Sequence, residues 1–104
     1  MKSNKDLLRE KATALPPSPG VYLMKDATGK IIYVGKSRRL SARVASYFTG
    51  NEHAVKTARM VSQVADFDTI LCDTEIEALG LENTLIKKYK PRYNIKLKDA
   101  KSYP

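Results

Sequence analysis

The sequence contains one cysteine, one histidine and no tryptophan in 104 residues. Because Cys72 is alone, the chain has no intramolecular disulfide and no zinc site built from cysteines. His53 has no second histidine, so neither a histidine-based zinc site nor an H-N-H type nuclease is expected from it. We interpret Cys72 as a small buried apolar residue and His53 as a surface or capping residue.

Long apolar runs are missing as well. No stretch approaches the ~20 residues that span a bilayer. The N-terminus, MKSNKDLLREKATAL, is charged throughout and has no apolar segment of a secretory signal. The length suits a single domain over residues 1–104. We expect this domain to be cytoplasmic and to be an N-terminal fragment of a longer protein.

Acidic residues are scarce: 11 Asp and Glu face 19 Lys and Arg, giving a net charge of +8. Such an excess of cations favours a polyanionic partner, because binding releases the partner's counterions. A solubility role is the simpler alternative. An anionic membrane surface is disfavoured, since no expected helix combines a basic face with large exposed apolar residues. We therefore expect a nucleic-acid partner.

Hydrophobic periodicity and turn residues predict the order β-β-α-α-β-α after a short N-terminal helix. The expected helices cover residues 5–14, 38–48, 53–65 and 74–89, and the expected strands cover 20–25, 31–35 and 66–73. This order predicts an α+β domain with a small three-stranded antiparallel sheet flanked by helices. The helix at 5–14 has little apolar surface, so we expect loose packing. The apolar run at 70–72 favours the central place for the last strand.

The first two strands are expected to form a hairpin around a turn at 26–29, where Gly29 suits a positive φ. A loop of this length sets Tyr22 directly opposite Tyr33 on one face of the sheet. A loop shorter by one residue would turn the two rings to opposite faces. Ser37, after the second strand, is expected to be the N-cap of the following helix.

Glu82 disturbs the pattern of the last expected helix, which covers residues 74–89. With side chains about 100° apart, its apolar arc consists of Ile76, Ala78, Leu79, Leu81, Leu85, Ile86 and Tyr89. Glu82 falls near the middle of this arc, where an unpaired carboxylate would cost several kcal/mol. The residue therefore requires a partner, such as an ion pair with Arg43, or a bound metal ion. Thr74 and Glu77 predict a capping box at the start of this helix.

Other polar residues stand out only when they are taken together. Tyr22 and Tyr33 lie in the hairpin, Lys36 and Arg43 follow its second strand, and Asn94 comes just after the last helix. Singly, each has an ordinary explanation as a core tyrosine, a solvated lysine, an arginine stem over an apolar side chain or a turn residue.

Together these residues match a known pattern. Gly20-Val21-Tyr22 and Tyr33-Val34-Gly35 resemble the two-strand signature of the GIY-YIG nuclease superfamily, with valine in place of both signature isoleucines. Within it the chain resembles the UvrC family, the C subunits of the bacterial excinuclease, at their N-terminal domain. The matching words are PGVYLMKD, IIYVGKS, LSARVASYF, EALGLEN, LIKKYKPRYNIKLKD and KSYP.

The resemblance implies a metal-dependent DNA endonuclease that hydrolyses a phosphodiester on the 3′ side of a lesion during nucleotide excision repair. It implies one divalent ion, Mg²⁺ or Mn²⁺, with Glu82 as the protein ligand. One carboxylate suffices because Mg²⁺ keeps most of its waters. The implied partners are damaged double-stranded DNA, UvrB and the UvrA–UvrB–DNA complex, with the UvrB-binding region outside this fragment.

The resemblance also implies roles for individual side chains. Tyr33 is the implied base for the attacking water, helped by the cation of Lys36, and Tyr22 positions the water or Tyr33. Arg43 is implied to bind the scissile phosphate. Tyr47 would orient Arg43, while Asn94 would bind the metal's water shell or lock the Glu82 helix to the sheet. The expected DNA contacts are Lys36, Arg38, Arg39, Arg43, Lys96 and Lys98.

Two other functions remain open from the sequence. A GIY-YIG nuclease of another substrate class, structure-specific or homing, is disfavoured because LKDAKSYP and Pro91-Arg92-Tyr93-Asn94 resemble the repair family. A non-catalytic nucleic-acid-binding module would use only the basic surface, and it would have no need for a sheltered Glu82.

Overall fold

The computed structural model describes residues 3–49 and 55–94 of the chain. Its elements are α1 (Asn4–Thr13), β1 (Gly20–Lys25), β2 (Ile31–Ser37), α2 (Leu40–Tyr47), α3 (Val55–Gln63), β3 (Asp66–Leu71) and α4 (Glu75–Tyr89). This order confirms the predicted α+β arrangement. In the part of the chain described, no helix is long and apolar enough to cross a membrane.

The three strands form one antiparallel sheet in the order β2-β1-β3, so β1 is the central strand. The expectation that residues 66–73 form the central strand is wrong. Ile70 is 39% exposed and Leu71 is 53% exposed, because β3 lies at an edge of the sheet. The run from Val21 to Met24 is instead buried on both faces of β1.

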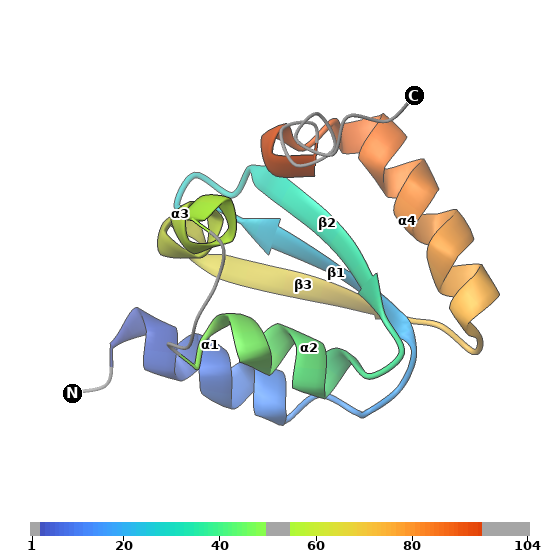
Figure 1. Cartoon of the computed structure of the whole chain (residues 1–104), viewed down its shortest axis with the longest axis horizontal. Coiled ribbons are helices and arrows are strands. Elements are labelled where there is room, and N and C mark those ends of the chain that lie inside the picture. Colours follow the sequence, from blue (N-terminus) through green and yellow to red (C-terminus); the bar gives the residue numbers. More distant parts are fainter. Residues whose placement is uncertain (1–2, 50–54, 95–104) are drawn as a thin grey trace.

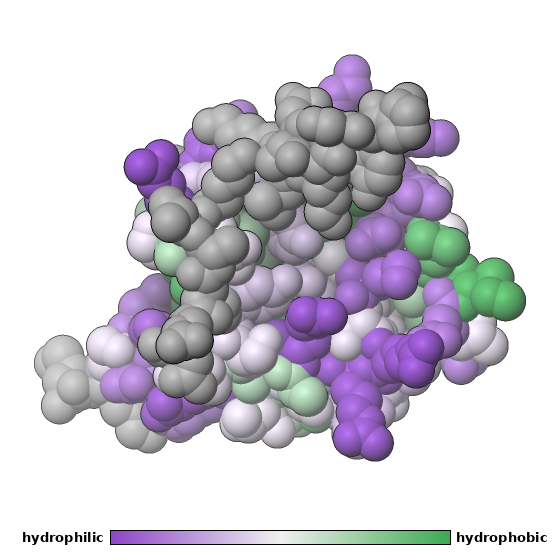
Figure 2. Space-filling model, viewed as in Figure 1, coloured by the Kyte–Doolittle hydropathy of each residue, from purple (hydrophilic) through white to green (hydrophobic). Residues whose placement is uncertain are grey.

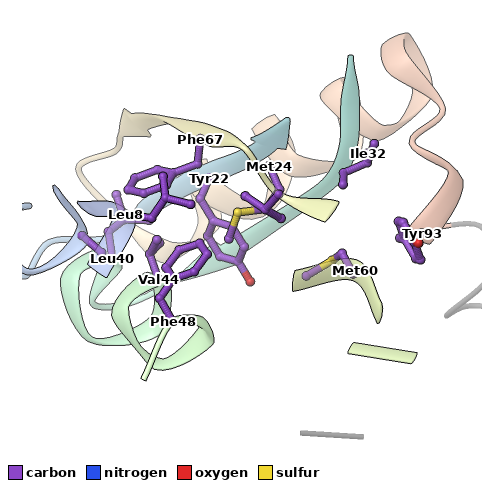
Figure 3. Packing of buried hydrophobic residues seen from close by; sticks show 12 residues of the cluster. Leu8, Tyr22, Met24, Ile32, Leu40, Val44, Phe48, Met60, Phe67 and Tyr93 are labelled. Carbon is purple, nitrogen blue, oxygen red and sulfur yellow. The ribbon is translucent and has the colours of Figure 1, made fainter. Parts of the chain in front are cut away.

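Helices cover both faces of this sheet. In Figure 1, α1 and α2 lie together on one side and α4 lies on the other. Side chains alternate along β1, so Tyr22 and Met24 join the core beneath α1, α2 and α3, while Val21 and Leu23 join the core beneath α4. Figure 3 shows the larger of these two cores, which gathers side chains from both the helices and the sheet.

Helix α1 is held more firmly than its sequence indicates. Leu8 and Ala12 are buried in the larger core, and Ser3 caps the start of the helix by accepting from the N–H of Asp6. Lys11 donates to Asp66 Oδ1 at 2.8 Å and to the carbonyl of Phe67 at 2.9 Å. The expected loose packing is therefore wrong, because two small apolar contacts and one anchored lysine fix the helix.

The hairpin register differs from the expected one by two residues. Tyr22 pairs with Gly35, and Tyr33 pairs with Met24, so the two tyrosines are diagonal neighbours rather than directly opposite. The N–H of Asp26 donates to the carbonyl of Lys30, which leaves a three-residue loop ending at Gly29 with φ of 86°.

A three-residue loop alone would place Tyr22 and Tyr33 on opposite faces of the sheet. A β-bulge in β2 brings them back to the same face. The register shifts between Met24 and Lys25, whose partners Tyr33 and Ile31 are two residues apart, so Ile32 is the extra residue of β2. Ile32 is buried in the same core against which Tyr33 packs. Tyr22 and Tyr33 therefore lie on one face, as predicted, but by a different route.

The helices after the hairpin are shorter than expected. Helix α2 begins at Leu40, and Ser37 belongs to β2, where its hydroxyl bonds the backbone N–H and carbonyl of Arg39 instead of capping the helix. In α3, Met60 is buried and Ala58 is exposed. His53 and Ala54 lie outside the described residues, and Cys72 is buried as expected.

Helix α4 begins beside its predicted N-cap, Thr74, and ends at Tyr89 as expected. The hydroxyl of Thr74 accepts from the N–H of Glu77 at 3.1 Å, and Lys90, with φ of 45°, ends the helix before Pro91. Its buried stripe is narrower than the expected arc, since a helix on a sheet buries only the side that faces the strands. Ala78 and Leu85 are buried, while Ile76, Leu79 and Tyr89 are exposed.

Two glycine substitutions should have opposite effects on stability. Gly80→Ala should stabilise the protein by about 1 kcal/mol, because α4 leaves open space there and alanine favours a helix. Gly29→Ala should destabilise it by about 1 kcal/mol, because the positive φ strains a side chain. Urea denaturation measures both free energies of unfolding, and shifts of the same sign would contradict the roles given to these two glycines.

Candidate active site

Three tyrosines from three elements meet on one side of the sheet. Tyr22 comes from β1, Tyr33 from β2 and Tyr47 from α2. The hydroxyls of Tyr22 and Tyr47 are 2.7 Å apart and share a hydrogen bond. The ring of Tyr22 lies 6.1 Å from that of Tyr33 and 5.7 Å from that of Tyr47, measured between centroids. The bonded hydroxyls fix the position of α2 against the hairpin.

Gly35 makes room for this arrangement. It is the register partner of Tyr22, whose ring lies across the glycine backbone. A Cβ atom added to Gly35 would overlap the hydroxyl and ring of Tyr22, so any larger residue would displace the phenol. Sequence reasoning used Gly35 only as part of the family signature and missed this supporting role. The sequence did contain a sign of this role, because Gly35 follows Tyr33 by two residues and therefore lies on the same face of the strand as the phenols.

The buried phenols are held in their neutral form. Burial raises the pKa of Tyr22 well above its ordinary value, and the neighbouring phenols add to this, while the Arg43 cation acts in the opposite direction. Burial likewise raises the pKa of Tyr33 to about 12, with the charges of Tyr47 and Glu82 adding to the effect. Both phenols therefore carry their protons at neutral pH in the metal-free domain.

Glu82 lies close enough to the hairpin for its carboxylate to act on the phenol of Tyr33. It is half-buried on α4, one turn after the buried Ala78 and about one turn before the buried Leu85. Within the described residues, no three His, Cys, Asp or Glu side chains are grouped as a metal-ligand set. A single carboxylate beside phenol oxygens fits a Mg²⁺ ion that keeps most of its waters.

Arg43 lies on α2, one turn before Tyr47, and it connects the phenols to a surface groove. Its charge acts on the phenol of Tyr22, and its exposed side chain lines a groove of about 790 Å³. The same groove is lined by the cations Lys36, Arg38 and Arg39. Four cations therefore line one groove, where they could contact successive phosphates of a nucleic acid.

Lys36 pairs with Val21 in the register, so by alternation it lies on the opposite face of β2 from Tyr33. Its side chain is exposed at the wall of the groove. An effect of Lys36 on the Tyr33 phenol stays a prediction.

Asn94 bonds the backbone of the sheet edge. Its Oδ1 accepts from the N–H of Val34 at 2.7 Å, and its Nδ2 donates to the carbonyl of Val34 at 2.8 Å. The side chain is only 7% exposed. Because β2 lies at an edge of the sheet, no strand of the sheet pairs with its outer side, and the Asn94 amide forms the hydrogen bonds that these backbone groups require. Of the two expected roles, the locking of the segment after α4 to the sheet is the one that this contact can fill.

The sequence-derived site residues thus fall into three sets. Tyr22, Tyr33, Tyr47, Arg43 and Glu82 surround one site, Lys36, Arg38 and Arg39 line the adjoining groove, and Asn94 supports the strand behind Tyr33. Lys96 and Lys98 lie outside the described residues.

A family model for the UvrC-like GIY-YIG domain matches residues 18–95. The chain belongs to this family. It is 61% identical to the UvrABC system protein C of Desulfitobacterium hafniense over 102 residues, which are 98% of this chain and 17% of that protein. It is 60% identical to the UvrABC system protein C of Moorella thermoacetica over 97 residues, 93% of this chain and 16% of that protein.

A solved structure gives the same result at the level of the fold. The crystal structure of the GIY-YIG N-terminal endonuclease domain of UvrC from Thermotoga maritima, bound to its catalytic magnesium, is 40% identical in sequence. It matches with a TM-score of 0.76, over 89% of this chain and 98% of that domain. This GIY-YIG chain therefore spans nearly all of a solved nuclease domain but only about one-sixth of the length of the UvrC proteins.

The raised pKa of Tyr33 predicts a loss of stability in alkali. Below pH 10 the phenol is protonated in both the folded and the unfolded chain. Between pH 10 and about 12 the unfolded chain releases this proton while the folded chain keeps it, so the free energy of unfolding should fall by ~2 kcal/mol. Tyr33→Phe should make this slope shallower in urea denaturation series, with the remainder due to Tyr22, whose pKa is also raised. Tyr89→Phe, at an exposed position, should leave the slope unchanged.

Proposed function

We propose that this domain is a divalent-metal-dependent DNA endonuclease that makes the incision 3′ to a lesion in nucleotide excision repair. The observation that carries the proposal is the cluster of three phenols beside a cationic groove. The charge of Glu82 acts on Tyr33 in this cluster, and the charge of Arg43 acts on Tyr22. The 40% identity to a magnesium-bound UvrC endonuclease domain supports the same chemistry. Damaged double-stranded DNA is the proposed substrate.

Glu82 would hold the divalent ion, Mg²⁺ or Mn²⁺, together with a phosphate oxygen of the DNA and water. When bound, such an ion supplies a Lewis acid for the phosphate and lowers the pKa of neighbouring water. The described residues contain no group of three His, Cys, Asp or Glu side chains that could hold a metal, so an ion at Glu82 would have coordination positions left for the substrate.

Tyr33 would orient the attacking water through its hydroxyl oxygen. With a pKa of about 12 in the metal-free domain, Tyr33 keeps its proton, so it could act as a base only after a nearby cation stabilises its phenolate form and the phenol proton is released to solvent. Tyr22 and Tyr47 keep each other's hydroxyls in place through their 2.7 Å bond. Asn94 holds the backbone of Val34, next to Tyr33, and so limits the movement of the phenol.

Arg43 would donate to the scissile phosphate as negative charge develops during attack. Lys36, Arg38 and Arg39 would bind flanking phosphates, which position DNA without reading its sequence. UvrB and the UvrA–UvrB–DNA complex are the proposed partners, which would deliver the damaged strand to the groove. A cytoplasmic location is part of this proposal.

Glu82→Gln should reduce incision 3′ to a lesion by at least ~100-fold in the intact protein with UvrA, UvrB and Mg²⁺. The amide keeps the shape of the side chain but cannot hold the ion as a carboxylate does. DNA binding should persist, because the groove cations are unchanged. Glu77→Gln, an exposed position on the same helix, is the matched control and should cut normally. Near-normal cutting by the Glu82 variant would contradict the proposal and favour a module that only binds DNA.

Tyr33→Phe should reduce the rate constant for incision by about 100-fold without weakening substrate binding, since it removes only the oxygen that faces the water. Single-turnover cleavage over a range of pH measures this effect separately from DNA affinity. Tyr89→Phe, at the far end of α4, is the control for a lost phenol. A variant with a normal rate at every pH would remove Tyr33 from the mechanism.

A further inference from the structure

The groove beside the active site has two walls of different chemistry. One wall carries the cations Lys36, Arg38, Arg39 and Arg43, from β2, its connection to α2, and α2 itself. The other wall carries Ile76 and Leu79, from the first turns of α4. Figure 2 shows hydrophobic surface over the beginning of α4, next to strongly hydrophilic surface. An apolar wall thus faces a cationic wall across one groove.

The apolar wall is exposed to an unusual degree. Ile76 is 83% exposed and Leu79 is 45% exposed, although both belong to the apolar arc of the helix. Single exposed apolar residues need no explanation. Here two of them line the same groove, and that groove also contains the phosphate-binding candidate Arg43. An occupant that places charge on one wall and an apolar group on the other would satisfy both.

We propose that Ile76 and Leu79 contact an unstacked base of the DNA strand whose phosphates lie along the cationic wall of the groove. This inference rests on the proposed function and narrows its substrate to DNA with an unpaired or displaced base beside the cut. A nucleotide carries its charge on the phosphate and its apolar face on the base, which matches the two walls. Aliphatic side chains placed against base faces are a common way to hold distorted DNA.

Charge favours DNA over a protein as the occupant. Among the described residues that line the groove, Glu75 is the only acid, and it is ion-paired with Arg38. A protein docking on Ile76 and Leu79 would have to desolvate the neighbouring cations or supply its own acidic groups. A DNA strand neutralises them with phosphates and releases counterions as it binds.

The test compares the affinity of the chain for three duplexes in a Glu82→Gln background, which prevents cleavage. One duplex is fully paired, one has a single unpaired base, and one has an abasic unit at the same place. Fluorescence anisotropy should show about tenfold tighter binding to the unpaired base than to either other duplex, as expected for one base contact. The abasic duplex separates a base contact from a preference for flexible backbone.

Ile76→Ser combined with Leu79→Ser should reduce this preference to less than twofold and leave binding to the paired duplex unchanged. Leu7→Ser is the matched control, since Leu7 is 53% exposed on α1 and does not line the groove. Arg39→Gln should instead weaken binding to all three duplexes and lower the salt dependence, because it removes one phosphate contact.

Several results would overturn the inference. These are equal affinity for all three duplexes, the same preference for the abasic unit, or a preference that survives in the double variant. Loss of UvrB association by the double variant, with its DNA preference intact, would assign the apolar wall to a protein partner. If the protein cuts DNA but shows no preference for the duplex with the unpaired base, this inference alone is overturned. If it shows that preference but the protein with Glu82 intact does not cut, the proposed function alone is overturned.

Discussion

The hydrogen bond between the hydroxyls of Tyr22 and Tyr47 connects the two halves of the site. Tyr22 belongs to the central strand, and Tyr47 belongs to the helix that carries Arg43. Burying a hydroxyl costs free energy unless it is hydrogen-bonded, so the bond with Tyr47 offsets the cost of burying the Tyr22 hydroxyl. The bond therefore couples the position of α2 to the register of the sheet. Gly35 is part of the same constraint, because only a residue without a side chain leaves space for the Tyr22 ring.

Electrostatics gives the site its second property. A chain with a net charge of +8 places one carboxylate, Glu82, beside phenols that burial keeps neutral. The negative charge opposes ionisation of Tyr33, so the metal-free site resists forming a base. A bound cation would reverse this effect at the carboxylate and the phenol together. Because the carboxylate that would hold the ion also raises the pKa of Tyr33, this pKa would depend on whether the ion is bound.

The residues of the site were largely predictable from the sequence, whereas their supports were not. Glu82 could be singled out because a carboxylate interrupts the apolar arc of its helix, although the structure leaves it only half-buried. Asn94 could be named but not explained, since its two bonds to Val34 depend on which strand lies at the sheet edge. The apolar arc of α4 was overestimated, because helical periodicity shows which side chains share a face but not how much of that face is covered.

The order of elements, the positive φ of Gly29 and the N-cap of α4 at Thr74 were determined by the sequence itself, because each depends on residues close together in the chain. The central place of β1, the bulge at Ile32 and the anchoring of α1 were decided only by the tertiary structure. Strand order and register depend on which surfaces bury one another best across the whole domain. Local patterns leave such choices open, since Ile70 and Leu71 are as apolar as the residues that the core finally buries.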